Sequence, residues 1–271
     1  MSTDRINEQS SGPAQANSTT IAAAERIRIV LVGTQHPGNI GSAARAMKTM
    51  GLSRLVLVAP EKAPNAESYA LAAGADDVLA AASIHETLAE AIADCRLVLG
   101  CTARSRRIAL EELEPRAAGV RAVSEAAGGS EIALVFGRER TGLTNDEYEL
   151  CHVAVHIQAN PDYSSLNLAM AVQVLSYELR MAALAVGPAS AGEDERREPP
   201  ASHAEMEGFF SQLADTLDVI DFHKGRAPES AMRKLRRLFL RAQPDTREVR
   251  ILRGVLADAQ RMARLAGERD A

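Results

Sequence analysis

Residues 26–60 read RIRIVLVGTQHPGNIGSAARAMKTMGLSRLVLVAP and decide the fold. Two short runs of almost continuous Val, Ile and Leu flank a stretch with helical spacing. The alternation continues downstream, where further apolar runs occupy 96–103, 131–137 and 152–157. Strands that are apolar throughout are buried on both faces. The sequence therefore predicts an α/β domain with a mostly parallel sheet of five or six strands and helices on both faces.

Bulk composition describes an ordinary globular protein of 271 residues, 46% hydrophobic and 25% charged, with a net charge of -5. Its aromatic residues are five Phe and four Tyr, with no Trp. So few rings argue against a sheet that binds RNA by stacking bases on aromatic side chains. The acidic net charge alone also disfavours a nucleic-acid partner.

Composition divides the chain into four segments. Residues 1–24 form a Ser-, Asn- and Gln-rich tail without the apolar centre of a secretory signal. The α/β domain spans 25–186, a linker rich in Gly, Pro and charge spans 187–200, and a small all-α module spans 201–271. No stretch of 18 uncharged apolar residues is present. We expect a cytoplasmic protein without a membrane partner.

The cysteines and histidines do not form a metal-binding pattern. Cys95, Cys101 and Cys151 are odd in number and widely spaced, without CxxC, which indicates a reducing compartment. His152 and His156 lie four residues apart on a predicted strand, about 13 Å from each other, too far to share one ion. We expect no metal.

Charge is concentrated in the helical module. Residues 222–253 contain ten basic and three acidic side chains, a local charge of +7, and the rest of the chain contains 21 and 33, a charge of -12. A solvated helix face is one interpretation. The nearly single sign favours binding to a phosphate backbone. The candidate RNA-binding residues there are Arg233, Lys234, Arg236 and Arg237.

Ligands of parallel sheets bind beyond the carboxyl ends of the strands, so four loops are candidates. They are GTQHPGNIGSAAR (33–45), CTARSRR (101–107), FGRERTGLTNDE (136–147) and IQANPDYSSLNLAM (157–170). Taken singly, each also fits a plain turn, an exposed loop or a helix N-cap. Together they offer backbone, amide, hydroxyl and guanidinium groups. Such groups suit a nucleoside-like cofactor, a phosphate-bearing substrate and transfer chemistry that depends on positioning.

Three of these stretches together resemble a known enzyme class. GNIGSAARAMKTMG (38–51), LVFGRERTGLTNDE (134–147) and IQANPDYSSLNLAMAVQVLSYELR (157–180) are similar to the three motifs of the SPOUT-class RNA 2′-O-methyltransferases. Within the class, the chain most resembles the enzymes that methylate cytidine or uridine 32 in tRNA. The resemblance implies a C-terminal trefoil knot in the α/β domain, a homodimer, a tRNA substrate and S-adenosylmethionine as the cofactor.

The resemblance also implies roles for single residues. It places the cofactor against Cys101, Thr102, Ala103, Gly137, Ile157, Ser164, Ser165 and Leu166. Arg45 matches the arginine that acts at the ribose 2′-hydroxyl, and Asn39 and Ser165 match positions that orient it or the RNA. Because a guanidinium is a poor base, we expect Arg45 to grip the adjacent phosphate and the 2′-oxygen. Arg104 matches an RNA-contacting arginine. Glu139 could either favour the positive sulfonium of the cofactor electrostatically or fix its own loop, and we expect the second role.

Alternatives remain at this point. The same scaffold serves rRNA 2′-O-methyltransferases and non-catalytic knotted RNA-binding proteins. A Rossmann-type nucleotide enzyme would need GxGxxG after the first strand, and this sequence has GNIG there.

Overall fold

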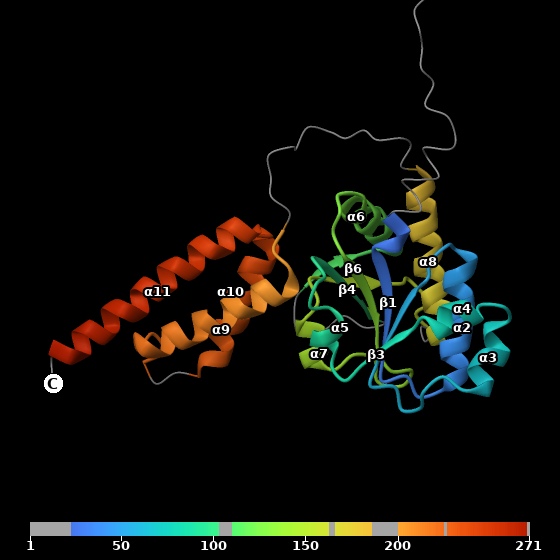
Figure 1. The fold of residues 1–271 in the computed structure, drawn as a ribbon, viewed down its shortest axis with the longest axis horizontal. Helices are drawn as coiled ribbons and strands as arrows, with labels where there is room; N and C mark the ends of the chain where they lie inside the picture. Colours follow the sequence, from blue (N-terminus) through green and yellow to red (C-terminus); the bar gives the residue numbers. More distant parts are fainter. Residues whose placement is uncertain (1–22, 103–109, 163–165, 186–199, 225–226, 270–271) are drawn as a thin grey trace, which may run out of the picture.

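The computed structural model describes residues 23–102, 110–162, 166–185, 200–224 and 227–269 (Figure 1). Within them, seven strands form one sheet in the order β3-β2-β1-β6-β4-β7-β5, and every neighbouring pair is parallel. The strands are β1 (Ile27–Val32), β2 (Arg54–Val58), β3 (Ser83–His85), β4 (Leu97–Thr102), β5 (Glu111–Leu113), β6 (Ile132–Phe136) and β7 (Val153–His156).

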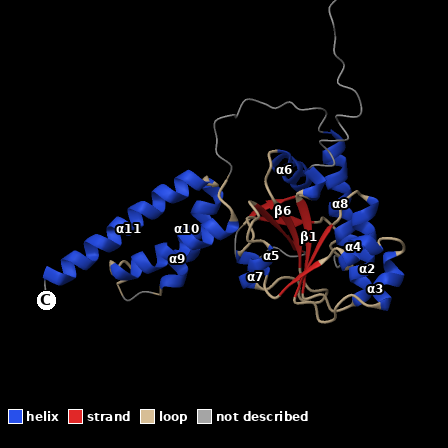
Figure 2. Ribbon diagram, in the orientation of Figure 1, coloured by secondary structure: helices blue, strands red, loops and turns tan. Residues whose placement is uncertain are grey.

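Helices cover both faces of the sheet, as predicted (Figure 2). On β1, Ile29 and Leu31 pack on one face and Val30 and Val32 on the other, so every residue of the strand is buried. The first face is covered by α2 (Pro37–Thr49), α3 (Ala66–Ala72), α4 (Asp76–Ala80), α6 (Pro115–Ala127) and α8 (Leu168–Ala185). The second is covered by α5 (Leu88–Ala91) and α7 (Asn145–Glu149).

Two edge strands go beyond the predicted five or six. β3 and β5 have three residues each, and their side chains are mostly exposed. Both lie at the rims of the sheet, where only one neighbour pairs with them. A short polar strand lacks the apolar run on which the prediction depends, so it is not recognised in the sequence.

The two ends of the α/β domain add detail to the prediction. Ala23, assigned to the tail in the sequence, is 2% exposed and packs in the core, so the ordered domain begins before residue 25. The knot stays a prediction, because the loop that would form it includes residues 163–165, outside the described residues.

Helix α8 is the one helix among the described residues that is long and apolar enough to cross a membrane. It packs against α2 and α6, and its Leu168, Val172, Leu175 and Leu179 belong to the hydrophobic core and are at most 6% exposed. This burial identifies α8 as a core helix of the α/β domain.

The helical module consists of α9 (His203–Val219), α10 (Pro228–Ala242) and α11 (Thr246–Arg269) (Figure 1). Its buried core includes Met206, Phe209, Phe210 and Val249. The helix starts predicted from the sequence are present. Pro228 occupies the first turn of α10. Before α11, the Glu248 backbone N–H donates to Asp245 Oδ1 (2.7 Å) and the Asp245 N–H donates to Glu248 Oε2 (3.0 Å), a capping box.

Candidate active site at the carboxyl ends of the strands

Three adjacent strands bring the expected cofactor-binding positions to one edge of the sheet. On β4 and β6, Cys101 lies opposite Phe136, so the next residues, Thr102 and Gly137, are level with each other. On β4 and β7, Thr102 lies opposite His156, which directly precedes Ile157. His156 Nδ1 also contacts the Thr102 carbonyl oxygen at 3.1 Å. Cys101, Thr102, Gly137 and Ile157 are partly buried. The result is a row of backbone groups beside small and apolar side chains.

The Glu139 carboxylate joins the first and third loops. Its Oε2 accepts the backbone N–H of Gln35 (3.0 Å), and its Oε1 accepts the N–H of His36 (3.3 Å) and the amide Nδ2 of Asn39 (2.9 Å). Asn39 Oδ1 in turn accepts Nδ2 of Asn167 at 3.0 Å. The first, third and fourth loops therefore share one hydrogen-bonded network, in which Asn39 contacts residues 100 and 128 positions away in the sequence.

This network keeps Glu139 ionised. Partial burial raises the pKa of Glu139, but the hydrogen bonds from Asn39 and from the Gln35 and His36 backbone outweigh that effect and leave the pKa below its ordinary value. A carboxylate whose oxygens already accept three donors is held in place. The geometry therefore favours the expected role of Glu139 in fixing the loop.

Arg138 fixes the same loop from its other side. Its Nη1 and Nη2 donate to the two carboxylate oxygens of Glu147 at 2.9 and 3.0 Å. Thr144 caps α7, and its side chain accepts the Glu147 N–H while Glu147 accepts the Thr144 N–H. The Arg138 side chain also lies against Gly33, whose φ is +58°. A two-pronged charge-assisted pair of this kind orients both partners.

Gly137 lies at a close approach of two backbone segments. A Cβ atom at Gly137 would lie 2.1 Å from the Gly142 carbonyl carbon and 2.2 Å from the Leu143 nitrogen. Arg138 and Gly142 exchange backbone hydrogen bonds of 2.9 and 3.2 Å across this turn. Only glycine fits there, because the neighbouring atoms belong to the main chain and cannot rotate away.

Other predicted site residues differ in their surroundings. Arg45 on α2 is exposed, and it makes no hydrogen bond or ion pair with another described residue. Leu166 is 38% exposed. The remaining predicted positions lie outside the described residues, namely Ala103, Arg104, Ser164 and Ser165.

The Cys101 thiol is not a nucleophile in this arrangement. Burial raises the pKa of Cys101, and the neighbouring Cys151 raises it further. The thiol is therefore neutral at physiological pH, and its chemistry is that of a small apolar side chain.

The predicted RNA-binding residues of the helical module fall into two groups. Arg233, Lys234 and Arg237 are exposed on α10, without a hydrogen bond or ion pair to another described side chain. Arg236 lies inside the module, where it forms a short ion pair with Glu207 and its guanidinium lies 4.5 Å from the centre of the Phe210 ring. Its geometry favours an internal structural role.

Two residues of these loops make contacts that the sequence did not predict. Asn167 links Asn39 to α8, since its Oδ1 also accepts the Ala169 N–H at 2.9 Å. Glu147 anchors Arg138. The spacing of Thr144 and Glu147 is the Thr-x-x-Glu pattern of a capping box, which marks this position in the sequence. For the link from Asn167 to Asn39 no local pattern exists, because it joins positions 128 residues apart.

Comparison with known proteins gives consistent matches. Residues 26–177 match the SpoU rRNA Methylase family, and residues 204–268 match the C-terminal domain of the tRNA methyltransferase TrmJ. The tRNA (cytidine/uridine-2′-O-)-methyltransferase TrmJ of Salmonella typhimurium is 52% identical over 236 residues, which cover 87% of this chain and 97% of that protein. The TrmJ of Escherichia coli (strain K12) is 51% identical over 87% of this chain and 96% of its own length.

A solved structure agrees with these matches. The crystal structure of TrmJ from Z. mobilis ZM4 superposes with a TM-score of 0.73 at 35% identity, covering 85% of this chain and 97% of that one. Both parts of the chain, the parallel sheet with its three motif loops and the helical module, have counterparts in these comparisons. The chain belongs to the SpoU methylase family, in the branch formed by the TrmJ tRNA methyltransferases.

Proposed function

We propose that the protein methylates the ribose 2′-oxygen of cytidine or uridine 32 in tRNA, with S-adenosylmethionine as the methyl donor, in the cytoplasm. The observation that carries the proposal is the network of Glu139, Asn39 and Asn167, which draws the three motif loops together beside the strand ends. The named activity of relatives that match nearly the whole chain supports the tRNA ribose as the acceptor.

The residues at the strand ends fit the cofactor. Partly buried Cys101 and Ile157 offer an apolar wall for an adenine ring, and the backbone of Thr102 and Gly137 offers hydrogen-bonding groups beside it. Leu166 and the undescribed Ala103, Ser164 and Ser165 complete the proposed contacts. When bound, the cofactor supplies an electrophilic methyl group on its sulfonium.

Arg45 is the proposed catalytic residue. Its planar guanidinium can donate to a phosphate oxygen and to the ribose 2′-oxygen at the same time. A guanidinium stays protonated in proteins, so it orients the hydroxyl and does not take its proton. With the cofactor bound, the new O–CH3 bond would form as the cofactor's S–CH3 bond breaks and its electron pair returns to sulfur, and the 2′-hydroxyl proton would pass to solvent. Asn39 and Ser165 are proposed to orient the reacting groups, and positioning supplies most of the rate.

Changing Arg45 to Lys tests this role. Arg45→Lys keeps the positive charge but removes the planar guanidinium that donates to two oxygens at once. The kcat/KM for tRNA methylation should therefore fall roughly 10- to 100-fold, which corresponds to the loss of one charged hydrogen bond. Single-turnover transfer of a labelled methyl group measures it. Because Arg45 is exposed, the thermal unfolding temperature should not change. Near-full activity of the Lys variant would contradict the forked contact.

A homodimer is proposed through the outer face of α8. Met170, Tyr177, Met181 and Leu184 are 41–60% exposed and lie along one stripe of the helix, opposite its buried side. A contiguous apolar stripe on a core helix is typical of a protein interface. Met181→Glu should therefore convert a dimer into a monomer in sedimentation equilibrium, and an unchanged mass would contradict this interface.

The helical module is proposed to bind the tRNA backbone through Arg233, Lys234 and Arg237. Arg104 is proposed as a further RNA contact from the α/β domain, whereas Arg236 is left out because of its internal contacts. Arg237→Gln should weaken tRNA binding and lower the slope of log K against log salt by about one. Arg116→Gln, which removes an exposed arginine from α6, is the matched control and should leave that slope unchanged. Equal slopes for Arg237→Gln and wild type would contradict the proposed contact.

Methyl transfer from labelled S-adenosylmethionine to purified tRNA and rRNA tests the proposed substrate. We expect incorporation into tRNA alone. Incorporation only into rRNA would favour an rRNA enzyme, and failure to bind the cofactor in calorimetry would favour a non-catalytic RNA-binding protein.

A further inference from the structure

The helical module docks on one turn of the α/β domain. The backbone N–H of His203 donates to the Cys95 carbonyl (2.8 Å), and the N–H of Ala204 donates to the Ala93 carbonyl (3.0 Å). Both donors belong to the first turn of α9, where N–H groups have no partner within the helix. We call residues 91–96 the docking turn. Main-chain hydrogen bonds of this kind set both the position and the direction of α9.

Two uncharged histidines complete the contact. The His203 ring meets the His152 ring edge-on, with centres 6.4 Å apart. His152 Nδ1 accepts the Val98 N–H at 3.1 Å, which requires an unprotonated nitrogen. Burial lowers the pKa of His152 to about 3, with His203 contributing, and burial lowers the pKa of His203 to about 4, with Arg236 contributing. Both rings are therefore neutral when the enzyme works near neutral pH.

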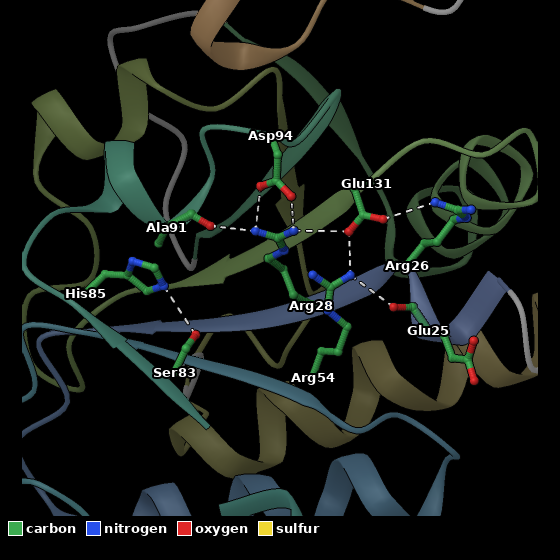
Figure 3. Close-up of polar contacts among 9 residues, drawn as sticks. All are labelled: Glu25, Arg26, Arg28, Arg54, Ser83, His85, Ala91, Asp94 and Glu131. Carbon is green, nitrogen blue, oxygen red and sulfur yellow. Dashed lines mark hydrogen bonds and ion pairs between the residues drawn. The ribbon is translucent and has the colours of Figure 1, made fainter. Parts of the chain in front are cut away.

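A cluster of arginines and carboxylates connects the docking turn to the neighbouring strands of the sheet (Figure 3). Arg28 Nη1 donates to the Ala91 carbonyl (2.9 Å) and to Asp94 Oδ1 (2.8 Å), and Nη2 donates to Asp94 Oδ2 (2.6 Å) and to Glu131 Oε2 (3.1 Å). Glu131 also binds Arg26 (3.2 Å) and forms a short ion pair with Arg54. Its backbone carbonyl accepts the Arg96 N–H at 2.8 Å. Both ends of the docking turn are thus tied to the sheet.

Arg28 is an unusual residue for its place. It is 6% exposed and lies on the same face of β1 as the buried Val30 and Val32. Burying a charge is costly unless it is paired and hydrogen-bonded. Nη1 and Nη2 make four hydrogen bonds, two of them to Asp94, the residue next to Cys95, whereas the buried Nε has no hydrogen-bond partner among the described residues. The Arg28 guanidinium therefore binds the docking turn, the segment whose carbonyl groups accept the hydrogen bonds from α9.

We propose that Arg28, Asp94 and Glu131 are positioning residues for the tRNA substrate, acting through the orientation of the helical module. The docking turn precedes β4, so it lies at the amino ends of the strands, whereas the motif loops lie at the carboxyl ends. A tRNA that touches both the module and the active site must span that separation. A change in the direction of α9 therefore misplaces the RNA without disturbing the cofactor site. The inference rests on the proposed RNA-binding role of the module.

The first test replaces Asp94 in the full-length protein. Asp94→Asn removes the charge that Arg28 holds and keeps the size of the side chain, which is 58% exposed. We expect KM for tRNA to rise roughly tenfold, with kcat and the affinity for S-adenosylmethionine unchanged. Arg26→Gln is the matched control, because it removes an exposed partner of the same Glu131 without touching the docking turn. Its KM should stay within twofold of wild type.

A second pair of variants isolates the backbone contact. Pro is well tolerated in the first position of a helix, and Ser202 before it is extended (φ -66°, ψ 161°), so His203→Pro preserves α9 while removing the N–H bound to Cys95. His203→Ala removes the same ring and keeps that N–H. We expect the Pro variant to have the higher KM for tRNA, and small-angle X-ray scattering to show a larger radius of gyration for it than for the Ala variant.

The outcomes separate this inference from the proposed function. If Asp94→Asn and His203→Pro leave KM for tRNA unchanged, or lower kcat and the unfolding temperature alone, the positioning role is wrong. In that case, weaker tRNA binding by the Arg237→Gln variant would still support RNA binding by the module. If Arg237→Gln also binds tRNA like wild type, the RNA-binding role fails as well.

Discussion

Replacing Gly137 by Ala should lower the free energy of unfolding by about 3 kcal/mol or more and abolish methyl transfer, because the new methyl group cannot be accommodated. Its Cβ would lie 2.1 Å from the Gly142 carbonyl carbon and 2.2 Å from the Leu143 nitrogen. To relieve the overlap, the turn that carries Arg138 and Glu139 must move. That movement breaks the network that joins the motif loops. Urea unfolding and labelled methyl transfer measure the two effects.

Gly128→Ala is the control for this prediction. Gly128 follows α6 with φ -74°, and the atoms nearest to an added Cβ there are 3.4 Å away or more. That substitution should leave the urea midpoint and the activity close to wild type. A Gly137→Ala protein with the wild-type midpoint would show that the two backbone segments are not in contact.

Replacing Glu139 by Gln should lower kcat/KM for tRNA roughly 100-fold, since displacement of a positioning group by about 1 Å has effects of that size. The Glu139 carboxylate accepts three donors, two from the backbone and one from Asn39. The Gln amide has only one acceptor oxygen and turns its NH₂ group toward N–H donors. The first loop, which carries Asn39 into α2, then loses its fixed position. Steady-state kinetics with saturating cofactor measure the loss.

Glu61→Gln is the matched control for Glu139→Gln. Glu61 accepts the Gln35 side chain at 2.9 Å, so it touches the same loop but contacts neither Gln35 N nor Asn39. Its activity should stay near wild type. If Glu139→Gln were as active as Glu61→Gln, the carboxylate would not hold the loop in the working enzyme.

The sequence predicts much of the α/β domain, because its five longer strands are continuous apolar runs and the motif loops follow three of them. Glycines and polar groups in those loops mark the site, and both Asn39 and Glu139 lie in the network where three loops meet. The start of α11 was also predictable, since Asp245 and Glu248 form a local pattern. In each case the signal lies within a few neighbouring residues.

Contacts between residues that lie far apart in the sequence could not be predicted from the sequence. Arg236 belongs to a run of basic residues and is a natural candidate for RNA, but Phe210 and Glu207 on another helix bind it internally. The docking of α9 depends on backbone carbonyls of the docking turn, and main-chain groups are the same for every sequence. The buried Arg28 was the one visible hint, a charge inside a strand that is otherwise apolar.

We propose that this protein methylates the ribose of nucleotide 32 in tRNA. Mass-spectrometric mapping of tRNA incubated with S-adenosylmethionine and either the wild-type protein or Arg45→Lys tests it most directly. We predict one new 2′-O-methyl group on cytidine or uridine 32 with the wild-type protein, and much less with the variant. A methyl group at another tRNA position or on a base, or no new methyl group in the tRNA, would contradict this proposal.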